Sequence, residues 1–177
     1  MTTKKLIGAL GVVASIGGIA TIAVIMGTGA CGNKEPEFAG VGKYRFGHTT
    51  RTDVKDGVCQ PTQIDDGKRT ATWCFALPAY KIANRPAEVE LYFDGPLEKM
   101  DAPLIEIQLK VRGCLEQDLE TWLRTSFGPP IEQREKRFYY KNSFLWAAAL
   151  IPSEPGRCRV HLLPHSEQGQ IAKTKLL

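Results

Sequence analysis

The sequence has few of the residues, and none of the common motifs, that carry enzymatic or metal chemistry. It contains three histidines, and no serine stands in the GxSxG pattern that hydrolases use to expose a nucleophile. P-loop, GxGxxG, HExxH and calcium-loop patterns are also absent. His161 and His165 are separated by Pro164 in a strand-like segment, so their spacing does not place them on one helix face. We therefore expect no catalytic site, no metal site and no cofactor, and we predict that the chain is not an enzyme.

The sequence also lacks the dense positive charge of a nucleic-acid-binding protein. Lys and Arg number 23 and Asp and Glu 19, which gives a formal net charge of +4. Residues 1–30 hold Lys4 and Lys5 as their only charges, so the remainder carries a net charge of +2. This balance argues against nucleic acid as a partner. Hydrophobic residues make up 43% of the chain, which is enough for a folded core and argues against global disorder.

Charge is missing altogether from residues 6–33. Residues 6–26 are mostly Leu, Ile, Val, Ala and Gly, a run long enough to span a hydrocarbon core of ~30 Å. Lys4 and Lys5 precede it, and a cationic end followed by an apolar run is typical of a secretory signal. The two lysines predict that the N-terminus stays in the cytoplasm and that the rest is exported. We predict a hydrophobic helix within residues 1–30, acting as a signal peptide or a transmembrane anchor.

Cys31 stands at the end of this run, after Gly27-Thr28-Gly29-Ala30. The arrangement resembles a bacterial lipoprotein signal, in which the cysteine thiol is acylated and the leader is cut before the cysteine. The resemblance implies that Cys31 is a lipid-attachment site and that the protein is membrane-anchored on the exported side of the bacterial cell envelope. Thr28 and Gly29 differ from the residues usual in that signal, so an uncleaved anchor over residues 6–26 remains the alternative.

The other four cysteines lack CxxC spacing, which removes support for redox, zinc-ribbon and haem motifs. An even number of cysteines in an exported domain suggests two disulfides. Three pairings are open, and we prefer one that closes a short turn-containing segment and ties the start of a helix to a late strand. The preferred pairs are Cys59 with Cys74 and Cys114 with Cys158.

Hydrophobic periodicity predicts the organisation of the exported part. Residues 31–41 are expected to be a tether, 42–165 a single exported domain and 166–177 a polar C-terminal tail. Period-two alternation predicts strands at 72–77, 88–94, 105–112, 137–141, 144–151 and 157–163, and a helical stripe predicts a helix over 114–127. A second, short helix is expected near 50–56.

These elements predict an α+β fold. We expect one antiparallel sheet of about six strands with two helices packed on one face, compatible with a degenerate αβββ tandem. The element order and the helix-ending Phe127-Gly128-Pro129 are loosely similar to small envelope lipoproteins of the SmpA type and to β-lactamase inhibitor proteins. The resemblance implies a non-catalytic binding or assembly role with an envelope protein partner.

A basic set near the end of the chain is a candidate binding surface. Arg157 and Arg159 alternate with apolar residues, so they are expected to share the wet face of the sheet. Together with Arg137 they form a candidate contact for an anionic surface such as lipid headgroups, with ordinary mixed surface charge as the alternative. An envelope enzyme or inhibitor domain on an uncleaved single-pass anchor remains the second hypothesis for function.

Overall fold

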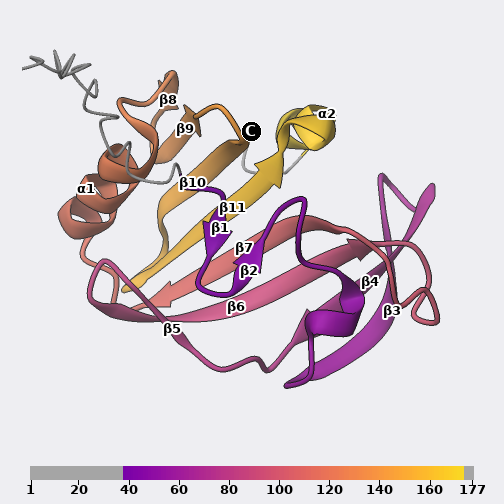
Figure 1. Ribbon diagram of the computed structural model, residues 1–177. Coiled ribbons are helices and arrows are strands. Elements are labelled where there is room, and N and C mark those ends of the chain that lie inside the picture. The colour runs from indigo at the N-terminus through magenta and orange to yellow at the C-terminus, as the bar shows by residue number, and fades with distance from the viewer. Residues whose placement is uncertain (1–37, 174–177) are drawn as a thin grey trace, which may run out of the picture. The chain divides into compact units, whose positions relative to one another are not determined.

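Antiparallel β-structure dominates the part of the chain that the structure describes, residues 38–173 of a computed structural model (Figure 1). In chain order the elements are β1 (Gly40–Val41), β2 (Tyr44–Arg45), the 3₁₀-helix η1 (Arg51–Asp53), β3 (Val58–Ile64), β4 (Arg69–Phe75), β5 (Tyr80–Ile82), β6 (Arg85–Asp94), β7 (Leu104–Arg112), α1 (Glu116–Phe127), β8 (Glu132–Arg134), β9 (Arg137–Lys141), β10 (Leu145–Glu154), β11 (Arg157–Pro164), the 3₁₀-helix η2 (His165–Glu167) and α2 (Gln168–Lys173).

One nine-stranded sheet organises these elements. Its strand order is β3-β4-β6-β7-β11-β10-β9-β8, with β5 paired to β6, and β1 and β2 form a separate two-stranded pair. Every pairing in the large sheet is antiparallel. The pairing of β7 with β11 places the strands before α1 beside the strands after it.

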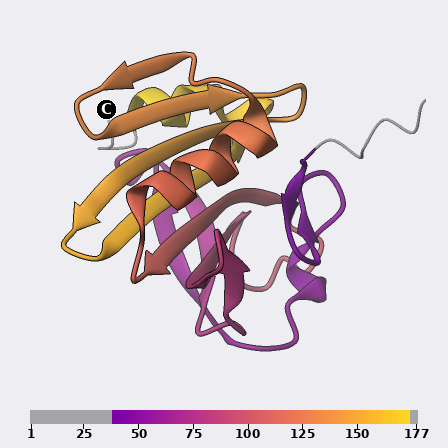
Figure 2. The same cartoon turned by 90° about the vertical axis from the view of Figure 1, so that its left-hand side faces the viewer.

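The predicted fold class is wrong. The described residues form a mostly β protein rather than an α+β fold, and the sheet has nine strands rather than about six. Of the two helices expected on one face, the one over 114–127 is present as α1, but residues 50–56 contain only the three-residue 3₁₀-helix η1. The short helix α2 was not expected, and it lies on the opposite side of the β9–β11 strands from α1 (Figures 1 and 2). The αβββ tandem fails because a run of strands from β3 to β7 precedes α1, with only a short 3₁₀-helix before it.

The expected N-terminal hydrophobic helix at residues 6–26 lies outside the described residues, as does Cys31. Within residues 38–173, no helix combines the length and the apolar composition needed to cross a membrane.

The main core lies on one face of the sheet, which we call the core face, and it includes residues of α1 and of the segment from Val41 to Val54. Leu119, Leu123 and Phe127 follow one another at helical spacing along α1, and all three are buried. Gly128 ends the helix with a φ of 82°, a backbone conformation that favours glycine. The sheet contributes Cys74, Val89, Leu91, Phe93, Ile107, Leu109, Val111, Phe138, Tyr140, Ala147, Ala149, Cys158, Val160 and Leu162 to this core.

Two disulfides reinforce the sheet, and they join the pairs that the sequence favoured. Cys59–Cys74 links β3 to β4 at a position where the two residues face each other in the strand register. Cys114–Cys158 links the residue before Leu115, at the start of α1, to β11 across a sequence separation of 44. The second bond ties the connection after β7 to the strand that pairs with β7, so it restrains the long-range part of the fold.

The C-terminal segment begins with ordered structure docked on the sheet. All described residues belong to one compact unit, and η2 and α2 occupy residues 165–173, where the sequence predicted a polar tail from residue 166. Arg69 on β4 holds this segment: its Nε donates to Asp94 Oδ1 over 2.8 Å, and its Nη1 and Nη2 donate to Glu167 over 2.8 and 3.1 Å. Glu167 is only 8% exposed, so its carboxylate depends on Arg69.

The Arg69 cluster predicts a dependence of stability on acidic pH. The hydrogen bond from Arg69 lowers the pKa of Asp94 below its ordinary value. A lowered pKa in the folded state means that ionised Asp94 stabilises the fold above its unfolded pKa of about 3.9, and that this stabilisation is lost as the pH falls through the folded value. For Arg69→Met we expect a stability deficit relative to the wild type that is large at pH 7 and shrinks below about pH 4.

Urea unfolding of both proteins at pH 7 and pH 3 measures this difference. Lys81→Met, an exposed lysine on β5, is the control and should show no such change with pH. An equal deficit of Arg69→Met at both pH values would contradict the assignment.

Candidate anion-binding site

Four cationic side chains lie together where β7 and β11 pair. Arg157 faces Arg112 and Arg159 faces Lys110 in the register of the two strands. The residues that alternate with them, including Val111 and Cys158, are buried in the core under α1. The four cations therefore project from the opposite side of the sheet, which we call the polar face.

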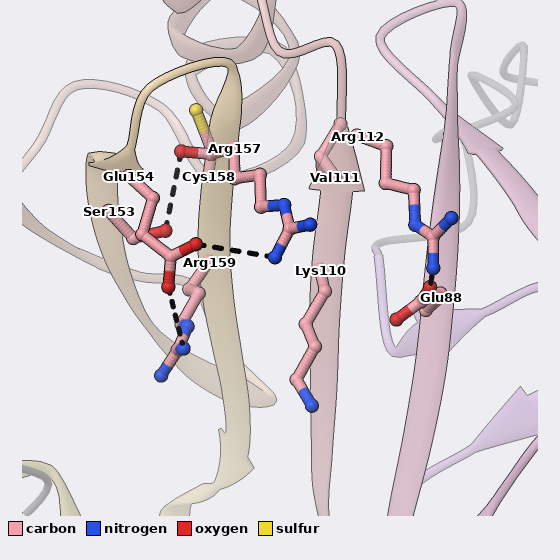
Figure 3. Close-up of a pocket in the computed structure, with 9 residues that line it drawn as sticks. All are labelled: Glu88, Lys110, Val111, Arg112, Ser153, Glu154, Arg157, Cys158 and Arg159. Carbon is pink, nitrogen blue, oxygen red and sulfur yellow. Dashed lines mark hydrogen bonds and ion pairs between the residues drawn. The ribbon is translucent and has the colours of Figure 1, made fainter.

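These cations surround a small cavity of about 50 Å³ at the β10–β11 turn (Figure 3). Figure 3 shows the guanidinium of Arg157 directed toward β7, with Lys110 and Arg112 along that strand. The lining residues are Glu88, Lys110, Val111, Arg112, Ser153, Glu154, Arg157, Cys158 and Arg159. The side chains that line the cavity thus include four cations and two carboxylates.

Acidic side chains from the flanking strands hold the cations in place. Glu154 on β10 accepts from Arg157 Nη1 at 3.3 Å and lies 3.6 Å from Arg159 Nη2. On the other side, Arg112 pairs with Glu88 of β6. These guanidinium groups remain about half exposed or more, so the pairs orient them without removing them from water.

The register explains what this site can do. Like charges directly opposite each other on neighbouring strands destabilise a sheet, and here two such pairs stand side by side. Glu88, Glu90 and Glu154 offset part of this repulsion. A carboxylate or phosphate oxygen placed above the sheet, among the four cationic side chains, would offset more of it, because guanidinium groups donate charge-assisted hydrogen bonds to such oxygens. The arrangement is therefore suited to binding an anionic group.

A partly buried polar network continues from the cavity along the polar face. Lys110 pairs with Glu90, whose side chain is 10% exposed. Farther along the same face of β7, Glu106 Oε1 lies 2.6 Å from His161 Nδ1 of β11 and accepts a hydrogen bond of 2.9 Å from Gln108 Nε2. Burial, and then the charges of Glu106 and Glu90, raise the pKa of Tyr92 beside them. These contacts cross three strands, so they stabilise the sheet that carries the cavity.

The structure brings together part of the predicted anionic contact. Arg157 and Arg159 are in the cavity, as a pair on one face, whereas Arg137 does not line it. Arg137 faces Leu150, which in turn faces Arg159, so Arg137 lies on the same row of the sheet but two strands away.

Sequence reasoning missed Lys110 and Arg112. Their alternation with apolar residues places them on the wet face of their strand, but alternation alone does not show that this strand pairs with β11. One weak signal is that both strands carry basic residues at alternate positions, 110 and 112 in one and 157 and 159 in the other.

The histidines and cysteines are distributed over separate places in the described residues. His161 bonds to Glu106. His165 follows β11, and its Nε2 lies 3.0 Å from the carbonyl of Asn142, in the turn between β9 and β10. His48 lines a different hollow, beside β2 and η1. All four cysteines of the described region are in disulfides, so none of them offers a thiol. No group of three His, Cys, Asp or Glu side chains in residues 38–173 is arranged to hold a metal ion.

The hollow beside β2 is larger, about 430 Å³, and also basic. Its walls include Lys43, Arg45, His48, Asp53 and Lys55. It is built on two-residue strands and a single turn of 3₁₀-helix, and Lys43 is already 3.5 Å from Asp56. Because it matches the first cavity in charge but not in framework, it provides control residues for binding experiments.

The pair between Lys110 and Glu90 predicts a measurable stability difference. Lys110→Met leaves the carboxylate of Glu90 buried without its cation, and we expect the free energy of unfolding to fall by about 2 kcal/mol. Glu90→Gln in the same chain should recover at least half of that loss, because it removes the unpaired charge. Urea denaturation of the single and double variants measures both effects.

Arg112→Met is the matched control, because both members of its ion pair are exposed. The side chain of Arg112 is 65% exposed and that of Glu88 is 43% exposed. Its cost should stay below about 1 kcal/mol. Equal losses for Lys110→Met and Arg112→Met would show that the burial of Glu90 is not what makes its pair important.

No protein-family model, no curated protein and no solved structure matches this chain, so the candidate site rests on its own geometry and charge.

Proposed function

We propose that this chain is a membrane-anchored protein of the bacterial cell envelope, with a non-catalytic binding module on the exported side. The uncharged residues 6–33 after Lys4 and Lys5 support export, and Cys31 at their end supports lipid attachment. The two disulfides are in keeping with an oxidising compartment. A transmembrane anchor at residues 6–26 is the alternative form of attachment.

The binding activity that we propose is capture of an acidic segment of an envelope protein partner. The observation that carries it is the pairing of Arg157 with Arg112 and of Arg159 with Lys110 on adjacent central strands. Side chains from such a rigid framework keep their positions better than side chains on loops. A carboxylate-bearing chain lying across the polar face can place its oxygens among these side chains, which donate charge-assisted hydrogen bonds to them.

The mass of the protein extracted from membranes tests the anchoring. A mass equal to residues 31–177 plus acyl chains is the expected result for a lipoprotein cut before Cys31. The full-length mass would instead support the transmembrane anchor. Recovery of unmodified protein from the soluble fraction would contradict anchoring in either form.

Binding of an acidic peptide tests the site. With the full chain in a non-ionic detergent, we expect a fluorescently labelled ten-residue glutamate peptide to bind in a salt-dependent manner. Arg157→Gln with Arg159→Gln should raise Kd by about tenfold or more, which corresponds to about 1.4 kcal/mol.

Arg45→Gln with Lys55→Gln is the control, because it removes the same charge from the other basic hollow. It should leave Kd within about twofold. Equal weakening by both pairs would mean that net charge rather than the β7–β11 site governs binding, and would overturn the assignment.

A further inference from the structure

The described chain begins at Phe38, and three contacts define where it enters the fold. The ring of Phe38 packs edge-on against Trp122 and Phe127 of α1, with centroid distances of 5.5 and 5.1 Å. Its carbonyl accepts a hydrogen bond of 2.8 Å from Asn142 Nδ2, in the turn between β9 and β10. Figure 2 shows the start of the coloured chain, the end of α1 and this turn on the same side of the unit. We call this side the entry end.

Large exposed apolar side chains occur at the entry end. Phe144 follows Asn142 in the β9–β10 turn and is 52% exposed. Ile131, in the connection from α1 to β8, is 56% exposed, and its backbone N–H donates to the Tyr139 carbonyl of β9. Lys141 lies beside them with its Nζ 4.7 Å from the ring centre of Trp146. Exposed apolar side chains next to a lysine are typical of protein surfaces at a membrane interface.

The length of chain before Phe38 limits how far the entry end can be from an anchor. From Cys31 to Phe38 the chain has seven residue steps, which span at most about 25 Å even when fully extended. From residue 26, the end of the alternative transmembrane segment, the limit is about 40 Å. In either form of attachment, the entry end is the part of the described unit nearest to the anchor along the chain.

We propose that the entry end, with Phe144, Ile131 and Lys141, rests in the interfacial layer of the bilayer that holds the anchor. The proposal depends on the membrane anchoring given under Proposed function. The tether brings the exposed apolar residues to the bilayer, where Phe144 and Ile131 leave water and Lys141 meets the headgroups.

This orientation assigns opposite roles to the two ends of the unit. β10 is 10 residues long and runs from the entry end to the β10–β11 turn, so the cationic cavity lies about 30 Å from the entry end. With the entry end on the bilayer, Arg157 and Arg159 lie at the end of the unit farther from the membrane. The site is then presented to a protein partner rather than to the lipid headgroups of the same bilayer.

A fluorine probe in the full-length protein tests the orientation. In one sample 4-trifluoromethylphenylalanine replaces Phe144, and in a second it replaces Leu115, which is 48% exposed and lies at the other end of α1. Each protein is reconstituted into vesicles of phosphatidylethanolamine and phosphatidylglycerol at a ratio of about 3:1, a composition that supplies the anionic headgroups considered above. Fluorine relaxation is measured with an aqueous gadolinium chelate and, separately, with lipids that carry a nitroxide on the acyl chain.

We expect the probe at position 144 to be relaxed by the nitroxide lipid and shielded from the chelate, with the reverse at position 115. Equal access of the chelate to both positions, in protein that floats with the vesicles, would overturn the orientation while leaving the anchoring intact. Shielding at position 115 instead of 144 would also overturn it. Failure of the protein to float with the vesicles would overturn the anchoring and the orientation together.

Discussion

The pairing of β7 with β11 is the interaction on which the rest of the structure depends. It joins strands from before and after α1 in register from Arg157 opposite Arg112 to Leu162 opposite Ile107. Bringing such distant segments together costs chain entropy, and Cys114–Cys158 reduces that cost by restraining the unfolded chain. The same pairing spreads one core beneath α1 and places four cations side by side on the other face.

The two faces of the sheet consequently have different uses. On the core face, apolar residues from both halves of the sheet form one continuous buried cluster with α1 and with Val41, Tyr44, Phe46 and Val54, and this cluster excludes water. The polar face carries the cavity and the cross-strand network around Glu90, Glu106 and His161, and it also holds η2 through Arg69. The cavity lies at one end of β10 and the chain enters at the other end, so a tether at the entry end leaves the cavity accessible to a partner.

The sequence predicts the longer apolar strands and misses the short or polar ones. The predicted strands correspond to β4, β6, β7, β9, β10 and β11. Of these, β6, β7 and β11 largely alternate, whereas β9 and β10 also bury residues on the second face. β3 was not predicted, since Pro61 interrupts it and its residues are mostly exposed. β5 and β8 are three residues long, too short for periodicity to be visible. These omissions turned a nine-stranded sheet into an expected α+β fold.

The sequence by itself determined which face of each alternating strand is apolar, and it favoured the observed pairing of the cysteines. Residues 1–31 are the basis for the predicted export and anchoring. Only the tertiary structure decided which strands are neighbours, which side of the sheet each helix covers, and that Lys110 and Arg112 join Arg157 and Arg159. The physical reason is that alternation specifies the direction of a side chain but not its cross-strand partner. Neighbours are chosen by the burial of the whole core, to which residues far apart in the chain contribute together.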